Sequence, residues 1–228
     1  MRERRPFTID AVYEKIVEGR RGGWCYEMNG LFGWALRELG FKVDYIAGAV
    51  NRQKNGDRAL MNHLALIVHL DRPFLADVGF GNGLLSPMPL TEGAFHDGRF
   101  EFKLTRDGDW WRFHNHRHNA FTYDFTEEPH AYERFEHKAR MMATTAESPF
   151  VQNLVVAKLT DDGMVTLTNA ALQIFSSAEI LEETAPNAEA LAQILSGHFG
   201  LEVRAIQALW NRVSSQQKTW TLKRLRGF

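Results

Sequence analysis

Apolar residues recur with a helical period in the first forty positions and with a period of two after them. Residues 9–18 carry an apolar stripe behind Thr8, a suitable capping residue, and a second helix is expected over about 25–39. That second helix is expected to bury a face made of Leu31, Ala35 and Leu39. From residue 41 the alternation predicts a strand, so the pattern indicates a helical region followed by a sheet.

Short strand patterns separated by turn residues fill the centre of the chain. A polar turn is expected over 51–57, and the apolar run 63–70 predicts a strand buried on both faces. Further strands are expected over 74–78, 100–104, 110–113 and 120–125. Such close spacing is typical of a small barrel or sandwich.

The last third of the chain mixes both periods. A charged helical link is expected over about 128–142, followed by strands within 151–159 and 164–169 and a helix after Pro186, while 202–210 fits either a strand or a helix. This order of elements predicts an α+β fold with three regions. They are a helical region (1–40), an antiparallel β-barrel (41–142) and a C-terminal α/β region (143–228).

Composition excludes several classes of function. The 228 residues carry 27 basic and 28 acidic side chains, so the net charge of −1 gives no reason to expect a nucleic-acid partner. No apolar run approaches the roughly 18–20 residues that span a bilayer, and the N-terminus has no apolar signal region. A single cysteine excludes an internal disulfide, so a cytoplasmic protein without a membrane partner is expected. Nothing in the sequence specifies an oligomeric state.

The single cysteine, Cys25, stands at the predicted start of the second helix. Arg20 and Arg21 precede it closely, and Gly22-Gly23 lets the backbone turn tightly before it. A helix N-terminus and nearby cations both lower the pKa of a thiol, and the thiolate is the nucleophilic form. A lone cysteine is more often a small buried apolar residue, but this placement favours a nucleophile.

His63 and Asp77 are polar residues in apolar runs. Either residue alone is explained by hydrogen bonds in a core, because a buried carboxylate needs a partner. If the two strands are neighbours, Asp77 accepts from one imidazole nitrogen of His63 while the other nitrogen faces a sulfur. Together with Cys25 they predict an activated cysteine nucleophile.

Two other motifs carry weaker predictions. His114, His116 and His118 alternate, as metal ligands on a strand would, but no cysteine or carboxylate framework lies nearby, so a solvated turn is favoured and no metal site is predicted. The loop 79–83 is rich in glycine and suits a close approach to a ligand's phosphate. It lacks the Lys-Ser/Thr of a P-loop, so it remains a weak motif.

Taken together, these residues resemble the arylamine N-acetyltransferase family. The resemblance rests on Arg-Gly-Gly-Trp-Cys-Tyr-Glu-Met-Asn at 21–29, Leu31-Phe32, Leu39-Gly40-Phe41, the run 63–68 and Asp-Val-Gly-Phe-Gly at 77–81. The spacings of 38 and 14 residues from Cys25 to His63 and from His63 to Asp77 are also similar to that family. Weaker similarity continues at 148–150 and 162–167.

The resemblance implies a cysteine-protease-like core in which Cys25, His63 and Asp77 are catalytic, covered by a C-terminal α/β lid. It implies transfer of acetyl from acetyl-CoA, a co-substrate rather than a bound cofactor, to an arylamine, arylhydrazine or N-hydroxyarylamine through an acetyl-cysteine. Trp24 and Phe80 are expected to wall the substrate site, and Gly79 and Gly81 to approach the substrate.

The N-terminus departs from the family pattern. Members usually carry a helical segment with Pro-Phe-Glu-Asn before the position of Thr8, and only seven residues precede it here, so a shortened member is expected. A late start codon, a truncation and a reduced protein with a more open acceptor site are the three alternative explanations. The same three residues also suit a cysteine hydrolase, a transglutaminase-like enzyme or an amide synthase. An inactive shortened homologue is the non-enzymatic alternative.

Overall fold

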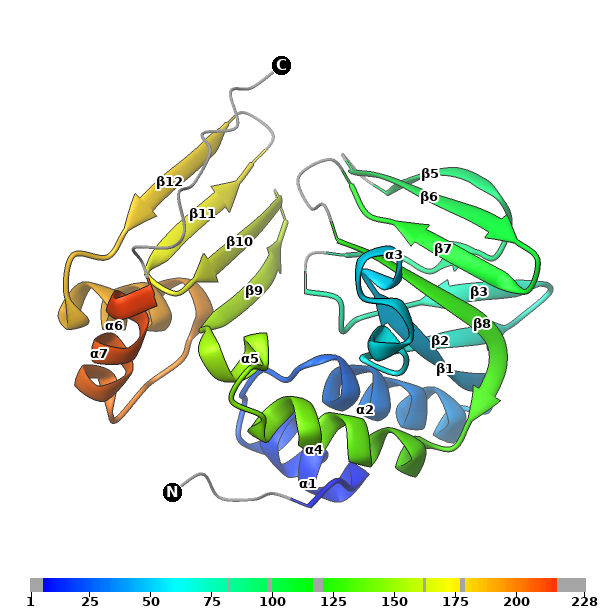
Figure 1. Ribbon diagram of the computed structural model, residues 1–228, viewed down its shortest axis with the longest axis horizontal. Helices are drawn as coiled ribbons and strands as arrows, with labels where there is room; N and C mark the ends of the chain where they lie inside the picture. The colour runs from blue at the N-terminus through cyan, green and yellow to red at the C-terminus, as the bar shows by residue number, and fades with distance from the viewer. Residues whose placement is uncertain are drawn as a thin grey trace. The chain divides into compact units, whose positions relative to one another are not determined.

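The computed structural model describes residues 6–81, 83–97, 100–116, 121–161, 163–176 and 179–216 (Figure 1). Two compact units divide the chain, Met1–Met141 and Met142–Phe228. The mixture of helices and two antiparallel sheets confirms the expected α+β class. The division into three regions stays a prediction.

Two helical segments open the first unit. Helix α1 (Ile9–Tyr13) begins after Thr8, whose Oγ1 accepts a hydrogen bond from the amide of Ala11 at 3.4 Å. It continues as the π-helical turn η1 (Glu14–Glu18). Helix α2 (Cys25–Glu38) then starts at the cysteine itself, as the sequence predicted.

The buried face of α2 differs from the expected one. The side chain of Leu39 is 75% exposed, whereas the helix buries Cys25, Tyr26, Asn29, Gly30 and Gly33. A Cβ on Gly33 would lie 2.5 Å from the ring of Tyr45, so the glycine lets the helix pack closely against the sheet. Apolar periodicity missed this face because glycines carry no hydrophobic signal.

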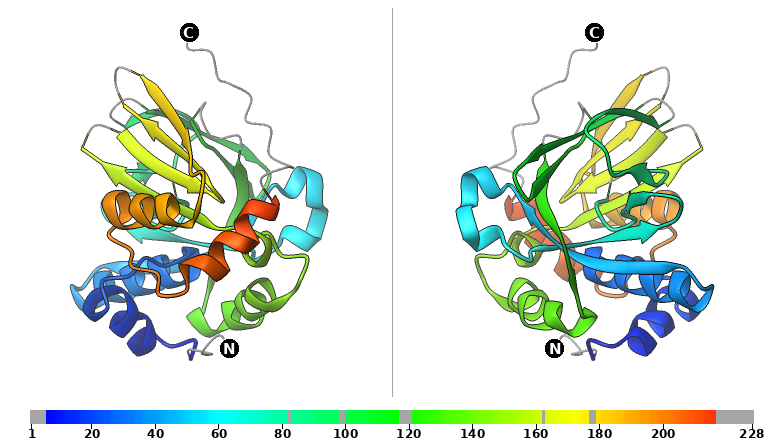
Figure 2. Two further views of the ribbon diagram at one scale, coloured as in Figure 1. Left: turned by 90° about the vertical axis from the view of Figure 1, so that its left-hand side faces the viewer. Right: turned by 90° about the vertical axis from the view of Figure 1, so that its right-hand side faces the viewer.

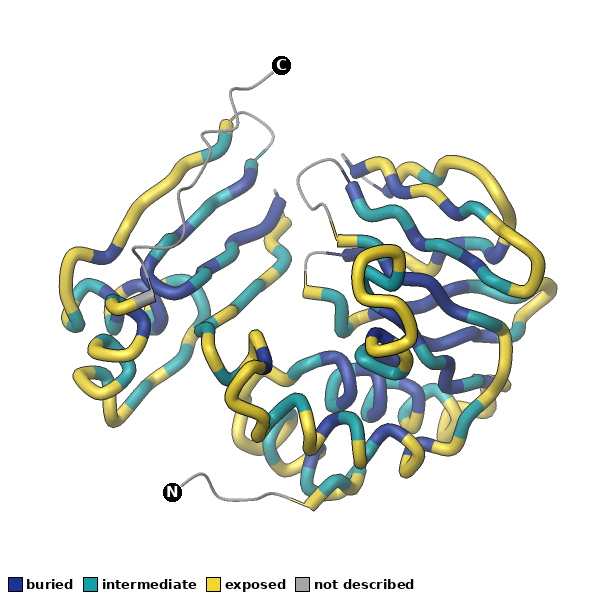
Figure 3. The backbone as a smooth tube through the Cα atoms, viewed as in Figure 1, coloured by how far each residue is buried: buried dark blue, intermediate teal, exposed yellow. Residues whose placement is uncertain are grey.

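An eight-stranded antiparallel sheet forms the rest of this unit. Its strands lie in the order β4-β3-β2-β1-β8-β7-β6-β5, so β1 and β8 meet at its centre (Figures 1 and 2). Their bounds are Lys42–Val50 (β1), His63–His69 (β2), Pro73–Ala76 (β3), Met88–Pro89 (β4), Gly93–Asp97 (β5), Phe100–Asp107 (β6), Trp110–His114 (β7) and Thr122–His130 (β8). Six of the seven residues of β2 are buried, which confirms the buried strand expected over 63–70 (Figure 3).

Asp97 links the two edges of this sheet. It ends edge strand β5, and its carboxylate accepts hydrogen bonds from the amides of Leu85 and Ser86 and from the Ser86 hydroxyl at 2.6–2.8 Å. Leu85 and Ser86 lie just before the other edge strand, β4. Side-chain hydrogen bonds therefore nearly close the sheet into a barrel.

Two connections in this unit differ from the expected pattern. The segment expected as a polar turn forms α3 (Arg52–Asn55) and the 3₁₀ turn η2 (Gly56–Ala59). Strand β8 extends to His130, so the link expected to be helical from 128 begins only with η3 (Tyr132–Phe135) and α4 (Glu136–Thr144). The longer strand is explained by its pairing with β1, in which His130 lies opposite Tyr45 and Pro129 lies opposite Ile46.

The second unit contains a four-stranded antiparallel sheet in the order β12-β11-β10-β9. Its elements are α5 (Pro149–Gln152), β9 (Val155–Thr160), β10 (Gly163–Thr168), β11 (Ala171–Phe175), β12 (Ile180–Thr184), α6 (Ala188–Phe199) and α7 (Ile206–Gln216). Leu167 and Leu172 of the sheet pack with Leu191 and Leu195 of α6 in one core. The undecided segment belongs partly to a helix, α7. Within the described residues, no helix combines the length and apolar character that crossing a bilayer requires.

Candidate active site

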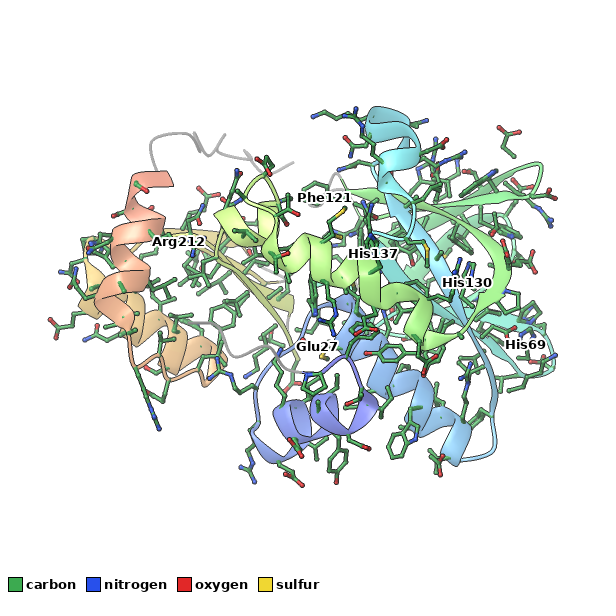
Figure 4. All side chains as sticks on the ribbon, turned by 60° about the horizontal axis from the view of Figure 1, so that its bottom comes forward. Glu27, His69, Phe121, His130, His137 and Arg212 are labelled. Atoms are coloured by element: carbon green, nitrogen blue, oxygen red, sulfur yellow. The ribbon has the colours of Figure 1, made fainter. Side chains whose placement is uncertain are left out.

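Cys25 is the first residue of α2, and the turn before it is held by a carboxylate. Glu27, labelled in Figure 4, accepts a hydrogen bond from the backbone amide of Trp24 at 3.2 Å. The same carboxylate pairs with the ammonium group of Lys15 at 2.6 and 2.8 Å. Arg20 and Arg21 are exposed. The nucleophile candidate therefore sits on a helix start that is tied to the preceding π-helical turn.

His63 connects the sulfur to a carboxylate. It is the first residue of β2, and its Nε2 lies 2.7 Å from Oδ2 of Asp77. This pairing leaves Nδ1 of His63 free of Asp77, and the Cys25 sulfur is near enough to His63 to raise the pKa of the imidazole. All three side chains are buried, with exposed fractions of 6% for Cys25, 2% for His63 and 5% for Asp77. The structure thus brings the three predicted residues together.

Asp77 follows the last residue of β3 and accepts hydrogen bonds on both oxygens. Besides His63, Oδ2 accepts from the Tyr123 hydroxyl at 3.0 Å. Oδ1 accepts from Nδ2 of Asn29 at 2.8 Å and from the amide of Gly79 at 2.9 Å. Four donors at these two oxygens fix the carboxylate in place and favour its charged form.

Asn29 and Tyr123 are site residues that the sequence analysis missed. Asn29 is fully buried, donates also to the carbonyl of Leu64 at 2.6 Å and accepts from the amide of Val78 at 2.9 Å. The sequence did offer a signal for Asn29, because an asparagine one helical turn after the cysteine lies on the same helix face as Cys25. A buried amide there needs several hydrogen-bond partners, which would include other site residues. Tyr123 offered no such signal.

The charges of the three residues support one another. Burial alone would lower the pKa of His63, but the carboxylate of Asp77 and the sulfur of Cys25 outweigh burial and raise that pKa to about 10. Burial opposes ionisation of Asp77 as well, yet the charge of His63 and the hydrogen bonds from His63, Asn29 and Gly79 lower its pKa. The pair therefore favours an imidazolium next to a carboxylate.

The four expected substrate-contact residues occupy different positions. The ring of Phe80 meets the His63 ring edge to face at 5.0 Å, and Gly79 packs directly against Cys25. The ring of Trp24 lies 4.9 Å from that of Tyr26, and Gly81 is exposed in a left-handed conformation with φ 72°. Their contact with substrate stays a prediction.

The alternating histidines do not form the solvated turn that the sequence favoured. His116 is 2% exposed and its ring lies, tilted, 4.4 Å from that of Phe100, while His114 pairs with the Thr105 hydroxyl at 2.9 Å. His118 lies outside the described residues. In the part of the chain that the structure describes, no group of three His, Cys, Asp or Glu side chains is arranged to hold a metal ion.

Comparisons with known proteins bear on what this site does. A family profile described as N-acetyltransferase matches residues 1–208. The chain is 34% identical over 205 residues to an arylamine N-acetyltransferase of Mycolicibacterium smegmatis, covering 86% of this chain and 74% of the relative. It is 32% identical over 209 residues to an arylamine N-acetyltransferase / N-hydroxyarylamine O-acetyltransferase of Salmonella typhimurium, covering 86% and 73%.

Solved structures give the same result. The M. smegmatis arylamine N-acetyltransferase superimposes with a TM-score of 0.82 at 32% identity, over 92% of this chain and 81% of the other. The Mycobacterium marinum enzyme in complex with CoA gives a TM-score of 0.83 at 26% identity, over 93% and 83%. Fold and sequence together define this chain as an acyltransferase. It belongs to the arylamine N-acetyltransferase family.

Proposed function

We propose that the protein transfers an acetyl group from acetyl-CoA to an arylamine, arylhydrazine or N-hydroxyarylamine through an acetyl-Cys25 intermediate. The observation that carries this proposal is the joint burial of Cys25, His63 and Asp77, with His63 bonded to Asp77 at 2.7 Å and the Cys25 sulfur near enough to raise the pKa of His63. The family supports the reaction, and the CoA complex of the M. marinum relative supports acetyl-CoA as the donor. The donor acts as a co-substrate.

In the first half-reaction the Cys25 thiolate attacks the thioester carbonyl of acetyl-CoA. A bond forms between the cysteine sulfur and the carbonyl carbon, and the bond from that carbon to the CoA sulfur breaks. The CoA thiolate leaves, and the imidazolium of His63 supplies its proton. Asp77 holds the imidazole through Nε2, so Nδ1 is the nitrogen left to exchange a proton with the sulfur.

In the second half-reaction the amine attacks the acetyl-cysteine. Acetylation removes the negative sulfur, which is one of the groups that raise the pKa of His63. The imidazole therefore loses its proton more readily in the acetyl-enzyme, so it accepts the proton of the attacking nitrogen. The carbon–nitrogen bond forms, the carbon–sulfur bond breaks, and the thiolate is regenerated.

Shielding the thioester from water is the remaining requirement of this mechanism. Burial of Cys25 under Gly79, together with the Phe80 ring beside His63, supports a water-poor environment around the sulfur. Phe80 and Trp24 are the residues proposed to wall the substrate site.

Mass spectrometry of the intact protein after incubation with acetyl-CoA alone tests the proposal. One added acetyl group on the tryptic peptide that contains Cys25 is expected, followed by its loss when an arylamine such as 4-aminobenzoate is added. Peptide or amide cleavage without any acetylation would instead support the hydrolase alternative. Absence of both reactions would support an inactive homologue.

A further inference from the structure

The start of β2, where His63 lies, is bracketed by two hydrogen bonds from α2. The Asn29 amide reaches the carbonyl of Leu64, one residue after His63, at 2.6 Å. The Tyr26 hydroxyl donates to the carbonyl of Met61, two residues before His63, at 2.7 Å. Tyr26 directly follows Cys25 in α2. This second hydrogen bond therefore connects the helix that carries the nucleophile with the residues just before His63.

Met61 holds a backbone conformation that its side chain disfavours. Its φ of 60° lies in the left-handed region, which long side chains rarely occupy because the Cβ crowds the following carbonyl. Such a residue costs on the order of 1–3 kcal/mol and persists only where its surroundings enforce it. Strained residues of this kind concentrate at functional sites.

Several contacts hold the segment that contains Met61. The side-chain amide of Asn62 pairs with the backbone of Val50 in the way that a neighbouring strand does. It accepts from the Val50 amide at 2.7 Å and donates to the Val50 carbonyl at 3.3 Å. The amide of Asn62 also bonds the carbonyl of Ala59 at 3.1 Å. The two bonds to Val50 tie the segment to β1, and the bond to Ala59 ties it to η2. The Tyr26 hydroxyl ties the Met61 carbonyl to α2.

The Tyr26 hydroxyl is a dependable donor. The residue is fully buried, and its ring packs against those of Trp24 at 4.9 Å and Phe135 at 6.1 Å. Burial raises the pKa of Tyr26, and the neighbouring sulfur of Cys25 raises it further. The phenol therefore keeps its proton and its hydrogen bond whether or not the cysteine is ionised.

We propose that Tyr26 is a positioning residue: its hydroxyl holds the strained Met61 backbone and thereby sets the distance between His63 and the Cys25 sulfur. This inference rests on the proposed function, because it concerns how that nucleophile is activated. A displacement of about 1 Å between reacting groups costs on the order of 100-fold in rate. Loss of the hydrogen bond between Tyr26 and Met61 is therefore expected to slow the reaction measurably.

The test uses three variants and a matched control. Tyr26→Phe removes only the hydroxyl and keeps the ring. Met61→Asn supplies a side chain that tolerates the left-handed conformation. The third variant combines both substitutions. Tyr45→Phe is the control, because the buried Tyr45 also donates to the backbone of α2, but at the Gly30 carbonyl at 2.9 Å and not at Met61.

Two rates are measured in each variant: acetylation of Cys25 by acetyl-CoA, and alkylation of Cys25 by iodoacetamide at about pH 6 relative to about pH 9. Tyr26→Phe is expected to slow acetylation about ten-fold at unchanged KM and to lower the alkylation ratio. Adding Met61→Asn to Tyr26→Phe is expected to recover most of both losses. Asparagine adopts the left-handed conformation without the hydrogen bond from Tyr26. Met61→Asn alone and Tyr45→Phe should leave both rates within about two-fold of wild type.

Equal rates in Tyr26→Phe and Tyr45→Phe, or a double variant no faster than Tyr26→Phe, would overturn the proposal. Should Tyr26→Phe fail to fold, Asn62→Ala is used instead, because it loosens the same segment from β1. Adding Met61→Asn must then recover the acetylation rate and the alkylation ratio that Asn62→Ala loses. If wild-type protein is not acetylated at all, the proposed function fails, while the alkylation ratios still decide the role of Tyr26.

Discussion

No side chain fits between Gly79 and Cys25. A Cβ on Gly79 would lie 2.6 Å from the Cα of Cys25 and 3.0 Å from its Cβ, and 2.7 Å from Nδ2 of Asn29. The two cysteine atoms belong to helix α2, and Nδ2 of Asn29 is held by hydrogen bonds to the Leu64 carbonyl and to Asp77, so none of these atoms can easily move aside. The glycine is therefore required for the loop after Asp77 to lie against the nucleophile.

Gly79→Ala is expected to destabilise the protein and to slow acetyl transfer. Overpacking of this kind costs about 1–3 kcal/mol, and it pushes apart the loop and the helix that carry Asp77 and Cys25. Urea unfolding and the rate of Cys25 acetylation measure the two effects. Gly22→Ala is the matched control, because a Cβ there meets no atom within 4 Å. Similar behaviour of the two variants would show that the close approach is unimportant.

Cys25→Ser should abolish acetyl transfer while the protein stays folded. A hydroxyl is far less acidic than a thiol, so His63 and Asp77 do not ionise it, and a loss of at least about 1,000-fold is expected. Serine is close to cysteine in size, so thermal unfolding should change little in this buried position. Acetyl transfer at a near wild-type rate in this variant would exclude the acetyl-cysteine mechanism.

Asp77→Asn is expected to cost far more than one hydrogen bond. The carboxylate accepts from four donors, and an amide nitrogen in place of either oxygen would face two of them. His63 also loses the charge that raises its pKa and the acceptor that fixes its tautomer, so a fall of about 1,000-fold or more in acetylation is expected. Acetyl-enzyme formation followed by mass spectrometry measures it. Tyr123→Phe, which removes one donor only, should be much milder.

Some of this site follows from sequence and some does not. Cys25, His63 and Asp77 stand out locally, because each is a polar or reactive residue at the edge of an apolar run. Asn29 and Tyr123 reach Asp77 from 48 and 46 residues away, and their partnership depends on how α2 and β8 pack, which periodicity does not encode. The long strands β1 and β2 were predictable from their apolar patterns. The edge strands β4, β5 and β12, which are short or largely exposed, were not.

Stability should depend on pH through His63. Its pKa is about 10 in the folded protein and near the ordinary value of 6.5 when unfolded, so between these values the folded state binds the extra proton. The contribution is fully present below about pH 6.5 and is lost as the pH rises towards 10. Asp77, whose pKa is lowered, contributes above its ordinary value of 3.8 and loses that contribution as the pH falls below it.

Urea unfolding from about pH 5 to about pH 10 tests this dependence. The free energy of unfolding is expected to decline by a few kcal/mol across the alkaline half of the range, and Asp77→Asn should flatten that decline. An unfolding free energy that rises with pH in the wild type would contradict the charged His63–Asp77 pair.

Asp97 should matter for stability and not for chemistry. Its carboxylate joins the loop before β4 to the end of β5 through three hydrogen bonds, and it is 8% exposed. Asp97→Ala leaves the amides of Leu85 and Ser86 without their acceptor, so a loss of about 2–4 kcal/mol is expected. Because these contacts lie at the sheet edges and involve none of Cys25, His63 and Asp77, Cys25 acetylation measured well below the melting temperature should stay within about two-fold of wild type. Asp107→Ala at the exposed end of β6 serves as the control for removing a carboxylate from this sheet. A loss of acetylation without a loss of stability would show that barrel closure acts on the site itself.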